Sequence, residues 1–226
     1  MTAVAVIDYG MGNVRSVSKA LEHVLSGAAG FSSGLPSGGE VAVTADKARI
    51  QAAERVVFPG VGALRDCLAE IRRRDLEDVL RDSLANKPFL GICLGMQALM
   101  DFSEENEGTP ALGVIPGCVR HFAGRIPAAD EQGPLKIPHM GWNRVHQVCD
   151  HPLWQGVPQD SRFYFVHSYY VEPDSEAVIA ATTEYGLRFA AALARDNVFA
   201  VQFHPEKSQQ LGLRLLANFL RWDGSV

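Results

Sequence analysis

The segment that decides the fold is Lys87-Pro88-Phe89-Leu90, Gly91-Ile92-Cys93-Leu94-Gly95 and Met96-Gln97-Ala98-Leu99-Met100. Its first part predicts a short apolar strand and its last part a helix, with a cysteine between two glycines at the junction. Glycines on both sides let strand and helix pack closely, as in a nucleophile elbow, which lifts the central side chain clear. Such a turn also places the sulfur at a helix N-terminus, which favours thiolate over thiol. We therefore expect Cys93 to be a nucleophile.

A second motif, Gln202-Phe203-His204-Pro205-Glu206, follows the apolar run Val198–Val201. Residues two apart on an extended backbone project to the same side, so we expect Glu206 to hold the imidazole of His204 in orientation. A lone cysteine after a strand is usually a buried small hydrophobe. The elbow and the His-x-Glu pair together, however, meet the demands of one mechanism, with Cys93 as nucleophile, His204 as base and Glu206 as the residue that orients the base.

Composition limits the class of protein. The chain has 226 residues, 47% hydrophobic and 21% charged, which is typical of a packed globular domain. A net charge of −5 and the lack of a Lys/Arg stripe argue against nucleic-acid binding, and no apolar run is as long as a membrane span. The four cysteines lie far apart without a CxxC pair, which favours free thiols in a reducing cytoplasm over disulfides or zinc. We expect no metal and no cofactor.

The order of elements predicts one α/β domain over residues 1–226, with a central mixed, mostly parallel sheet flanked by helices and an antiparallel extension. The first half alternates strands and helices, whereas the pattern after Gly113 is mainly strands. A Gly- and Ser-rich stretch, Ser26–Gly39, predicts a flexible surface insertion. Helices are expected over Val14–Leu25, Ala63–Ile71, Asp75–Leu84 and Leu211–Trp222, and strands of the second half over Val119–Phe122, Trp142–Val148, Arg162–Val171, Ala177–Thr183, Leu187–Ala194 and Val198–Phe203.

A glycine loop, Pro59-Gly60-Val61-Gly62, follows the strand that precedes the Cys93 strand. Backbone amides there, Val61 above all, could complement the amide of Leu94 in an oxyanion hole; the alternative is a plain tight turn. Because Val61 carries a Cβ, turning its amide inward needs a backbone flip that glycine would make easily, so we expect an incomplete oxyanion hole at rest.

Six segments, spread over nearly the whole chain, resemble the class I (triad-type) glutamine amidotransferases. More narrowly, they resemble the glutaminase subunits of imidazole glycerol phosphate synthase, which work with a barrel-shaped cyclase in histidine biosynthesis. The segments are Asp8-Tyr9-Gly10-Met11-Gly12-Asn13, Pro59-Gly60-Val61-Gly62, Gly91-Ile92-Cys93-Leu94-Gly95-Met96-Gln97, Pro138-His139-Met140-Gly141-Trp142-Asn143, Phe165-Val166-His167-Ser168-Tyr169 and Gln202-Phe203-His204-Pro205-Glu206-Lys207-Ser208.

The resemblance implies a role for each matching residue. Cys93 would attack the glutamine carboxamide, His204 would pass the proton to departing ammonia, and Glu206 would orient His204. The ammonia would go to the cyclase, which makes imidazole glycerol phosphate and AICAR. The residues expected to hold glutamine are Gly60, Gly62, Gln97, Ser168 and Tyr169, and those expected toward the cyclase and the ammonia passage are Asn13, Trp142, Tyr164 and Lys207.

Three other functions compete with this one. A glutaminase subunit of another amidotransferase is one; in the anthranilate type, His would typically stand in place of Met96. A free-standing thiol hydrolase acting on γ-glutamyl compounds or peptides is the second. A non-catalytic scaffold is the third, but such a relative should have lost a member of the triad, and Cys93, His204 and Glu206 are all present.

Overall fold

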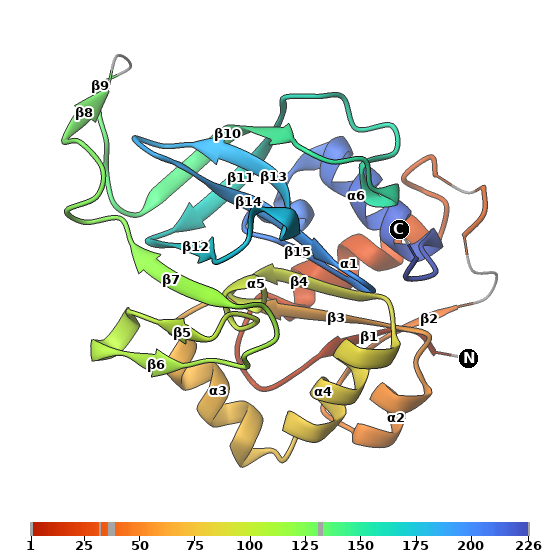
Figure 1. Cartoon of the computed structure of the whole chain (residues 1–226). Coiled ribbons are helices and arrows are strands. Elements are labelled where there is room, and N and C mark those ends of the chain that lie inside the picture. The colour runs from red at the N-terminus through yellow and green to blue at the C-terminus, as the bar shows by residue number, and fades with distance from the viewer. Residues whose placement is uncertain (1, 32, 36–38, 131–132, 226) are drawn as a thin grey trace.

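A nine-stranded mixed sheet forms the centre of the molecule (Figure 1). The computed structural model describes residues 2–31, 33–35, 39–130 and 133–225. Across the sheet the strand order is β11-β10-β13-β14-β15-β4-β3-β1-β2. The strands are β1 (Thr2–Ile7), β2 (Glu40–Thr44), β3 (Arg55–Gly60), β4 (Phe89–Cys93), β10 (His139–Gln147), β11 (Ser161–His167), β13 (Ile179–Glu184), β14 (Arg188–Arg195) and β15 (Val198–Val201).

The sheet has a parallel half and an antiparallel half. Strands β2, β1, β3, β4 and β15 run parallel to one another, whereas the pairs β15–β14, β14–β13, β13–β10 and β10–β11 are antiparallel. The carboxyl ends of β3, β4 and β15 therefore meet at one edge, which brings together the three segments that carry the glycine loop, the cysteine and the His-x-Glu pair. The predicted fold class is confirmed.

Helices cover both faces of the sheet, with α1 and α6 on one face and α2, α3 and α4 on the other (Figure 1). The α-helices are α1 (Val14–Leu25), α2 (Lys47–Ala52), α3 (Leu64–Arg73), α4 (Glu77–Asn86), α5 (Leu94–Gln97) and α6 (Gln209–Arg221). Short 3₁₀ helices are η1 (Glu105–Glu107), η2 (Pro152–Trp154), η3 (Glu176–Val178) and η4 (Pro205–Lys207). Helices α1, α3, α4 and α6 lie within two residues of their predicted bounds, α5 ends three residues before the predicted helical run Met96–Met100 does, and α2 was not predicted.

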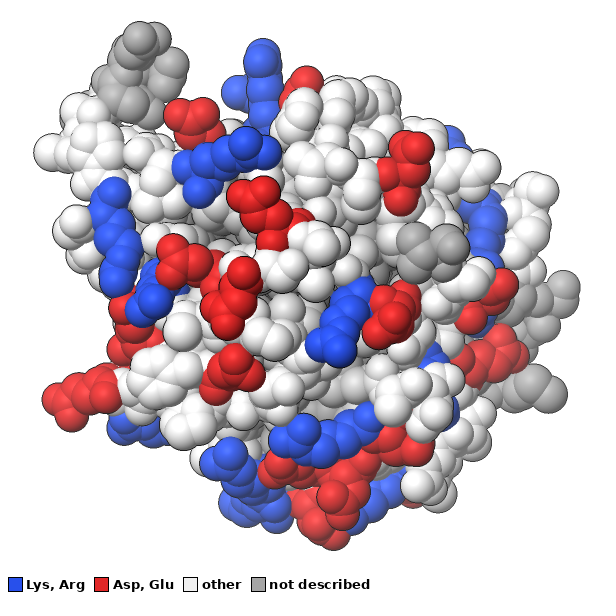
Figure 2. Space-filling model, viewed as in Figure 1, with Lys and Arg blue, Asp and Glu red and all other residues white. Residues whose placement is uncertain are grey.

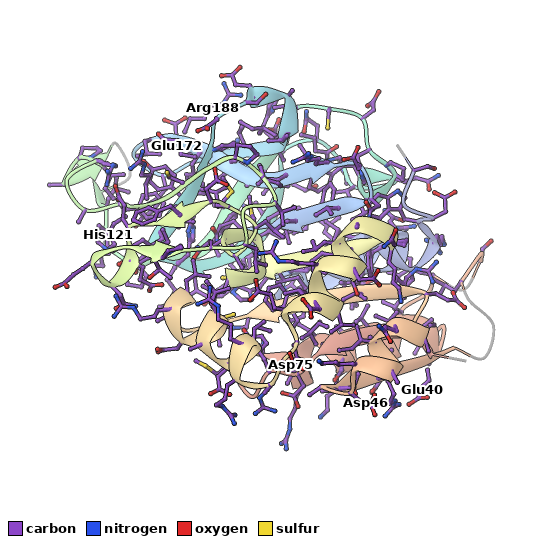
Figure 3. All side chains as sticks on the ribbon, turned by 60° about the horizontal axis from the view of Figure 1, so that its bottom comes forward. Glu40, Asp46, Asp75, His121, Glu172 and Arg188 are labelled. Atoms are coloured by element: carbon purple, nitrogen blue, oxygen red, sulfur yellow. The ribbon has the colours of Figure 1, made fainter. Side chains whose placement is uncertain are left out.

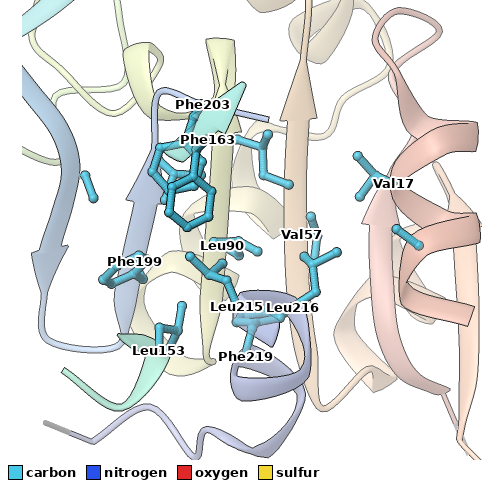
Figure 4. Close-up of a cluster of buried hydrophobic side chains, with 14 of the residues drawn as sticks. Val17, Val57, Leu90, Leu153, Phe163, Phe199, Phe203, Leu215, Leu216 and Phe219 are labelled. Carbon is cyan, nitrogen blue, oxygen red and sulfur yellow. The ribbon is translucent and has the colours of Figure 1, made fainter. Parts of the chain in front are cut away.

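Alternation along the buried strands divides the core into two layers. In β3, Val57 faces α1 and α6, and its neighbours Val56 and Phe58 face α3 and α4. Figure 4 shows the first layer, where Phe219 of α6 lies near Leu90 and Phe199 of the sheet. Because both faces are covered by helices, the central strands are apolar on both sides rather than alternating polar and apolar.

The run predicted as one strand, Arg162–Val171, is instead broken at Ser168. Its first part is β11, and its second part, β12 (Tyr169–Pro173), belongs to a separate four-stranded sheet of order β12-β7-β5-β6. The other strands of that sheet are β7 (Gly117–His121), β5 (Phe102–Ser103) and β6 (Thr109–Pro110), and a two-stranded ribbon is formed by β8 (Ala129–Asp130) and β9 (Gly133–Pro134). The break places Ser168 at the junction of two sheets, beside the carboxyl edge described above.

The Ser26–Gly39 stretch has no helix or strand in its described part, as its composition predicts, but it contacts the core. Phe31 is buried, and the Arg214 guanidinium lies over its ring at 4.2 Å. Arg221 of α6 donates to the carbonyl oxygens of Phe31 (2.9 Å) and Ser33 (2.7 Å). One aromatic residue of the segment and two arginines of the closing helix therefore attach its middle to the core, and its flexibility stays a prediction.

Charged side chains of both signs are interspersed over the surface. On the face in Figure 2, Lys and Arg lie among Asp and Glu rather than in a patch of one sign. Asp46, labelled in Figure 3, caps α2 by accepting from the amides of Ala48 (2.8 Å) and Arg49 (3.2 Å). Glu172, also labelled there, pairs with Arg120 at 2.8 Å. An exposed ion pair such as Arg120–Glu172 contributes at most about 1 kcal/mol to stability.

Candidate active site

Cys93 occupies a sharp turn between β4 and α5, with φ 55° and ψ −105°. The two glycines of the motif make this turn possible. A Cβ at Gly95 would lie 1.9 Å from the carbonyl oxygen of Phe58, and one at Gly91 would lie 3.0 Å from the carbonyl oxygen of Gly95. The strand and helix therefore approach too closely for side chains at these positions, and the cysteine is left in a left-handed conformation that a non-glycine residue rarely adopts. The sequence predicted this elbow from its glycines alone.

The glycine loop lies directly beside the cysteine. Gly60 pairs with Cys93 in the parallel register of β3 and β4, and a Cβ on Gly60 would lie 2.7 Å from that of Leu94. Val61 is about a third exposed and Gly62 has φ +96°. Since Leu94 is the first residue of α5, its amide has no partner within that helix. The loop and the helix start thus flank the sulfur, and the assignment of Val61 and Leu94 to an oxyanion hole stays a prediction.

His204 and Glu206 form the predicted pair. The Nδ1 atom of His204 lies 2.8 Å from Oε1 of Glu206, and both side chains are almost fully buried. The backbone differs from the expectation, because Glu206 lies in the 3₁₀ turn η4 and His204 immediately precedes that turn. The two side chains still meet, with His204 on extended backbone (φ −103°, ψ 96°) and only Glu206 inside the turn. Asn13 donates from Nδ2 to the same carboxylate oxygen at 2.9 Å.

The charge state of His204 depends on its neighbours. Burial lowers the pKa of His204, but the adjacent Cys93 sulfur and the Glu206 carboxylate together outweigh burial and raise it well above its usual value. The Nε2 atom is buried and has no hydrogen-bond partner among the described residues, so we treat the Cys93–His204 contact as proximity rather than a formed hydrogen bond. Catalytic hydrogen bonds often tighten only once substrate is bound. A protonated imidazole beside the cysteine favours the thiolate.

A pocket of about 320 Å³ opens over the cysteine. Its lining includes four residues expected to hold glutamine, namely Gly62, Gln97, Ser168 and Tyr169, together with Val61, Cys93 and Leu94. Gly60 is not part of the lining and instead pairs with Cys93 beneath it. A larger pocket, of about 470 Å³, lies at β13, β14 and η3 and contains no member of the triad. The smaller pocket is therefore the one that matches the chemistry.

Sequence reasoning missed Glu105, which also lines the pocket. Its Oε2 atom accepts from the amide of Leu64 at 2.6 Å, and this contact fixes the carboxylate at the start of α3. The available signal was the acidic loop Glu104–Pro110, which by composition was indistinguishable from a solvated turn. A carboxylate in a pocket of this size suits the ammonium group of an amino acid.

The residues expected toward a partner lie together. Trp142 of β10 packs edge-on against Tyr164 of β11 with ring centroids 6.1 Å apart, and Lys207 Nζ lies 5.8 Å from the Tyr164 ring. Trp142 is 41% exposed, and its neighbour Met140 is 62% exposed, so this end of β10 presents large apolar side chains to the outside. Asn13, by contrast, contacts the triad itself.

Other kinds of site find no support in the part of the chain that the structure describes. Within those residues, no group of three or more His, Cys, Asp or Glu side chains is arranged to hold a metal ion. Among the same residues, no helix combines the length and the apolar character needed to cross a membrane. All four cysteines are free.

Comparison with known proteins identifies the class. The family model for class-I glutamine amidotransferases matches residues 5–222. The chain therefore belongs to the class-I glutamine amidotransferase family, and within it to the group named imidazole glycerol phosphate synthase subunit HisH. The relative from Methylococcus capsulatus is 60% identical over 225 residues, which is 99% of this chain and 98% of the relative. The one from Nitrosococcus oceani is 56% identical over 224 residues, or 99% of each chain.

Solved structures agree on the fold. A crystal structure described as a glutamine amidotransferase covers 95% of this chain and 98% of its own, with a TM-score of 0.64 and 18% identity. A glutamine amidotransferase from Thermotoga maritima covers 91% of this chain and 76% of its own, with a TM-score of 0.55 and 16% identity. At these identities the likeness concerns the fold alone.

Proposed function

We propose that this protein hydrolyses L-glutamine to glutamate and ammonia, and that it passes the ammonia to a barrel-shaped cyclase subunit with which it forms a heterodimer. Its relatives are named as subunits of imidazole glycerol phosphate synthase, an enzyme of histidine biosynthesis. The observation that carries the proposal is the Cys93 elbow, which lines a pocket of about 320 Å³ and has the buried His204–Glu206 pair beside it. A cytoplasmic location is part of the proposal, supported by four free cysteines.

The proposed reaction has two halves. The Cys93 thiolate attacks the carboxamide carbon of glutamine, and the oxyanion that forms is bound by the amides of Leu94 and, once turned inward, Val61. His204 donates its proton to the nitrogen, the C–N bond breaks, and ammonia leaves a γ-glutamyl thioester on the sulfur. Water then loses a proton to His204 and attacks the thioester carbon, the C–S bond breaks, and glutamate is released.

The pocket accounts for how glutamine would be held. Gln97 donates both amide hydrogens inside the protein, to the carbonyl oxygen of Tyr169 and to Oε1 of Gln202, each at 3.1 Å. Only its own carbonyl oxygen is therefore left for the substrate. Glu105 would take the α-ammonium group, and the break at Ser168 would supply backbone groups to the substrate.

The cluster of Trp142, Tyr164 and Lys207 supports a partner surface next to this site. Large, partly exposed aromatic residues often act as anchors in protein interfaces. We place the cyclase there, with Asn13 near the boundary between the partner and the triad.

The test is glutamate release by the chain alone, with the candidate cyclase, and with the cyclase plus its nucleotide ligand. We expect slow hydrolysis alone and fast hydrolysis in the liganded complex. Full activity of the isolated chain would instead favour a free-standing thiol hydrolase. Activation by the synthase partner of another amidotransferase would favour a different pathway.

A further inference from the structure

The nucleophile has a polar neighbour that belongs to neither the triad nor the oxyanion loop. Gln202 follows β15 directly, its side chain is fully buried, and its Nε2 atom lies 3.6 Å from the sulfur of Cys93. This distance is within the range of an N–H···S contact. Helix α5 has only four residues, so its dipole contributes little at the sulfur, and local donors matter more.

The orientation of the Gln202 amide follows from the hydrogen bonds around it. The carbonyl oxygen of Tyr169 can only accept, so Gln97 must face it with its NH₂ group, at 3.1 Å. The same NH₂ group lies 3.1 Å from Gln202, which must therefore offer Oε1 to Gln97. This leaves the NH₂ group of Gln202 as the part that faces the sulfur.

A buried pair of histidines, His139 and His167, continues this hydrogen-bond network beyond the carbonyl oxygen of Tyr169. His167 Nδ1 donates to the same carbonyl oxygen of Tyr169 at 2.7 Å, so its Nε2 is left to accept from Nδ1 of His139 at 2.9 Å. His139 lies between the rings of Tyr185 and Phe165, with centroids 4.0 and 5.0 Å away, and cannot turn. The hydrogen bonds that link His139, His167, the Tyr169 carbonyl, Gln97 and Gln202 are all formed with only one assignment of donors and acceptors.

We propose that Gln202 is a further catalytic residue, whose side-chain N–H donates to the Cys93 sulfur and stabilises the thiolate before and after each acyl transfer. The proposal rests on Cys93 being the nucleophile. A donor to the charged form of a group favours that form, so Gln202 should hold the sulfur as thiolate at a lower pH than the elbow alone would. Gln97 acts on the sulfur only through Gln202, as a positioning residue.

Two substitutions of Gln202 distinguish the effect of its hydrogen-bond donor from the effect of its packing. Gln202→Met has a similar length without a donor, and Gln202→Glu keeps the acceptor for Gln97 while replacing the donor by a charged oxygen. Gln155→Met is the matched control, because Gln155 is exposed and does not line the pocket over Cys93. The readout is the rate of Cys93 alkylation by iodoacetamide against pH, with the modified residue located by peptide mapping, which needs neither glutamine nor the partner.

We expect the midpoint of the alkylation curve to move up by about one pH unit in Gln202→Met and further in Gln202→Glu, and to stay in place in Gln155→Met. With the cyclase and its ligand, kcat of Gln202→Met should fall about tenfold with KM nearly unchanged. A merely structural role would lower the melting temperature without moving the midpoint. If Gln202→Met does not fold, Gln202→Glu, which keeps the bond to Gln97, decides the matter.

An unchanged midpoint in a folded Gln202 variant would overturn the inference while leaving the proposed function intact. The proposed function fails on a different result, namely a Cys93→Ala protein that still releases glutamate in the liganded complex. The two failures are therefore distinguishable.

Discussion

Asn13 donates a hydrogen bond from Nδ2 to Oε1 of Glu206 at 2.9 Å, although the two residues are 193 positions apart in the chain. The same oxygen accepts from His204, so Asn13 holds the carboxylate that we propose orients the base. Asn13 also precedes α1 and ends the segment whose resemblance placed it toward the cyclase. It therefore lies where a change at the partner surface could reach the triad.

Asn13→Ala should lower kcat of the liganded complex about tenfold, or about 1.4 kcal/mol, and leave KM for glutamine nearly unchanged. The physical reason is that Glu206 loses a donor and orients His204 less well. The measurement is glutamate release at saturating cyclase, with Ser16→Ala, an exposed residue of the same helix, as control. A change confined to KM would assign Asn13 to substrate binding instead.

The buried histidine pair predicts how stability depends on pH. Burial lowers the pKa of His139 to about 4 and that of His167 to about 3. The unfolded chain, with histidines near their usual value, binds more protons between about pH 6.5 and 3, so the free energy of unfolding falls as pH falls through that window and levels off below it. For His139 the loss between pH 8 and 5 is about 2 kcal/mol.

Urea unfolding at pH 8 and pH 5 tests this, with His139→Gln as the variant that cannot be protonated. Its loss of stability over that interval should be about 2 kcal/mol smaller than that of the wild type. His23→Gln, at an exposed histidine of α1, is the matched control and should behave as the wild type does. Equal losses in wild type and His139→Gln would show that His139 is not held neutral.

The Ser26–Gly39 segment should contribute to stability but not to catalysis. Phe31→Ala removes a buried ring that packs under Arg214, and we expect the free energy of unfolding to fall by about 3 kcal/mol. Turnover per folded molecule in the liganded complex should stay within about twofold of wild type. A lost turnover in a folded Phe31→Ala protein would mean that the segment touches the partner.

The sequence predicted most of the fold and the contact between His204 and Glu206 because the signals are local. Helix α1 begins and ends at the predicted residues. The glycines around Cys93 indicate, from the sequence, that the strand and the helix pack closely there. What could not be predicted depends on register. His139 is opposite His167 only because β10 and β11 pair with that register, and a shift of one residue would separate them.

The break at Ser168 is a second feature that the sequence alone could not predict. The run Arg162–Val171 is continuously favourable for a strand, so nothing local marks the point where it leaves one sheet for another. Pairing of β12 with β7, rather than propensity, causes the break. The position of Glu105 in the pocket also depends on a contact between distant residues, because the amide of Leu64, 41 residues away, holds its carboxylate.

Val61 is expected to control the resting activity. If its amide must turn inward to complete the oxyanion hole, the Cβ of valine makes the required conformation less favourable than it would be for glycine. Val61→Gly should raise glutamate release by the isolated chain about tenfold and reduce the activation given by the cyclase and its ligand. A folded Val61→Gly protein with an unchanged basal rate would contradict this switch.

The central claim is that Cys93 carries the chemistry, and the most direct test is the rate of glutamate release by Cys93→Ala in the presence of the cyclase and its nucleotide ligand. Circular dichroism and co-purification with the cyclase should show that the variant folds and binds its partner as the wild type does. We predict that it releases no glutamate above the background without enzyme. A folded, cyclase-bound Cys93→Ala protein that releases glutamate at a rate near that of the wild type would contradict the account.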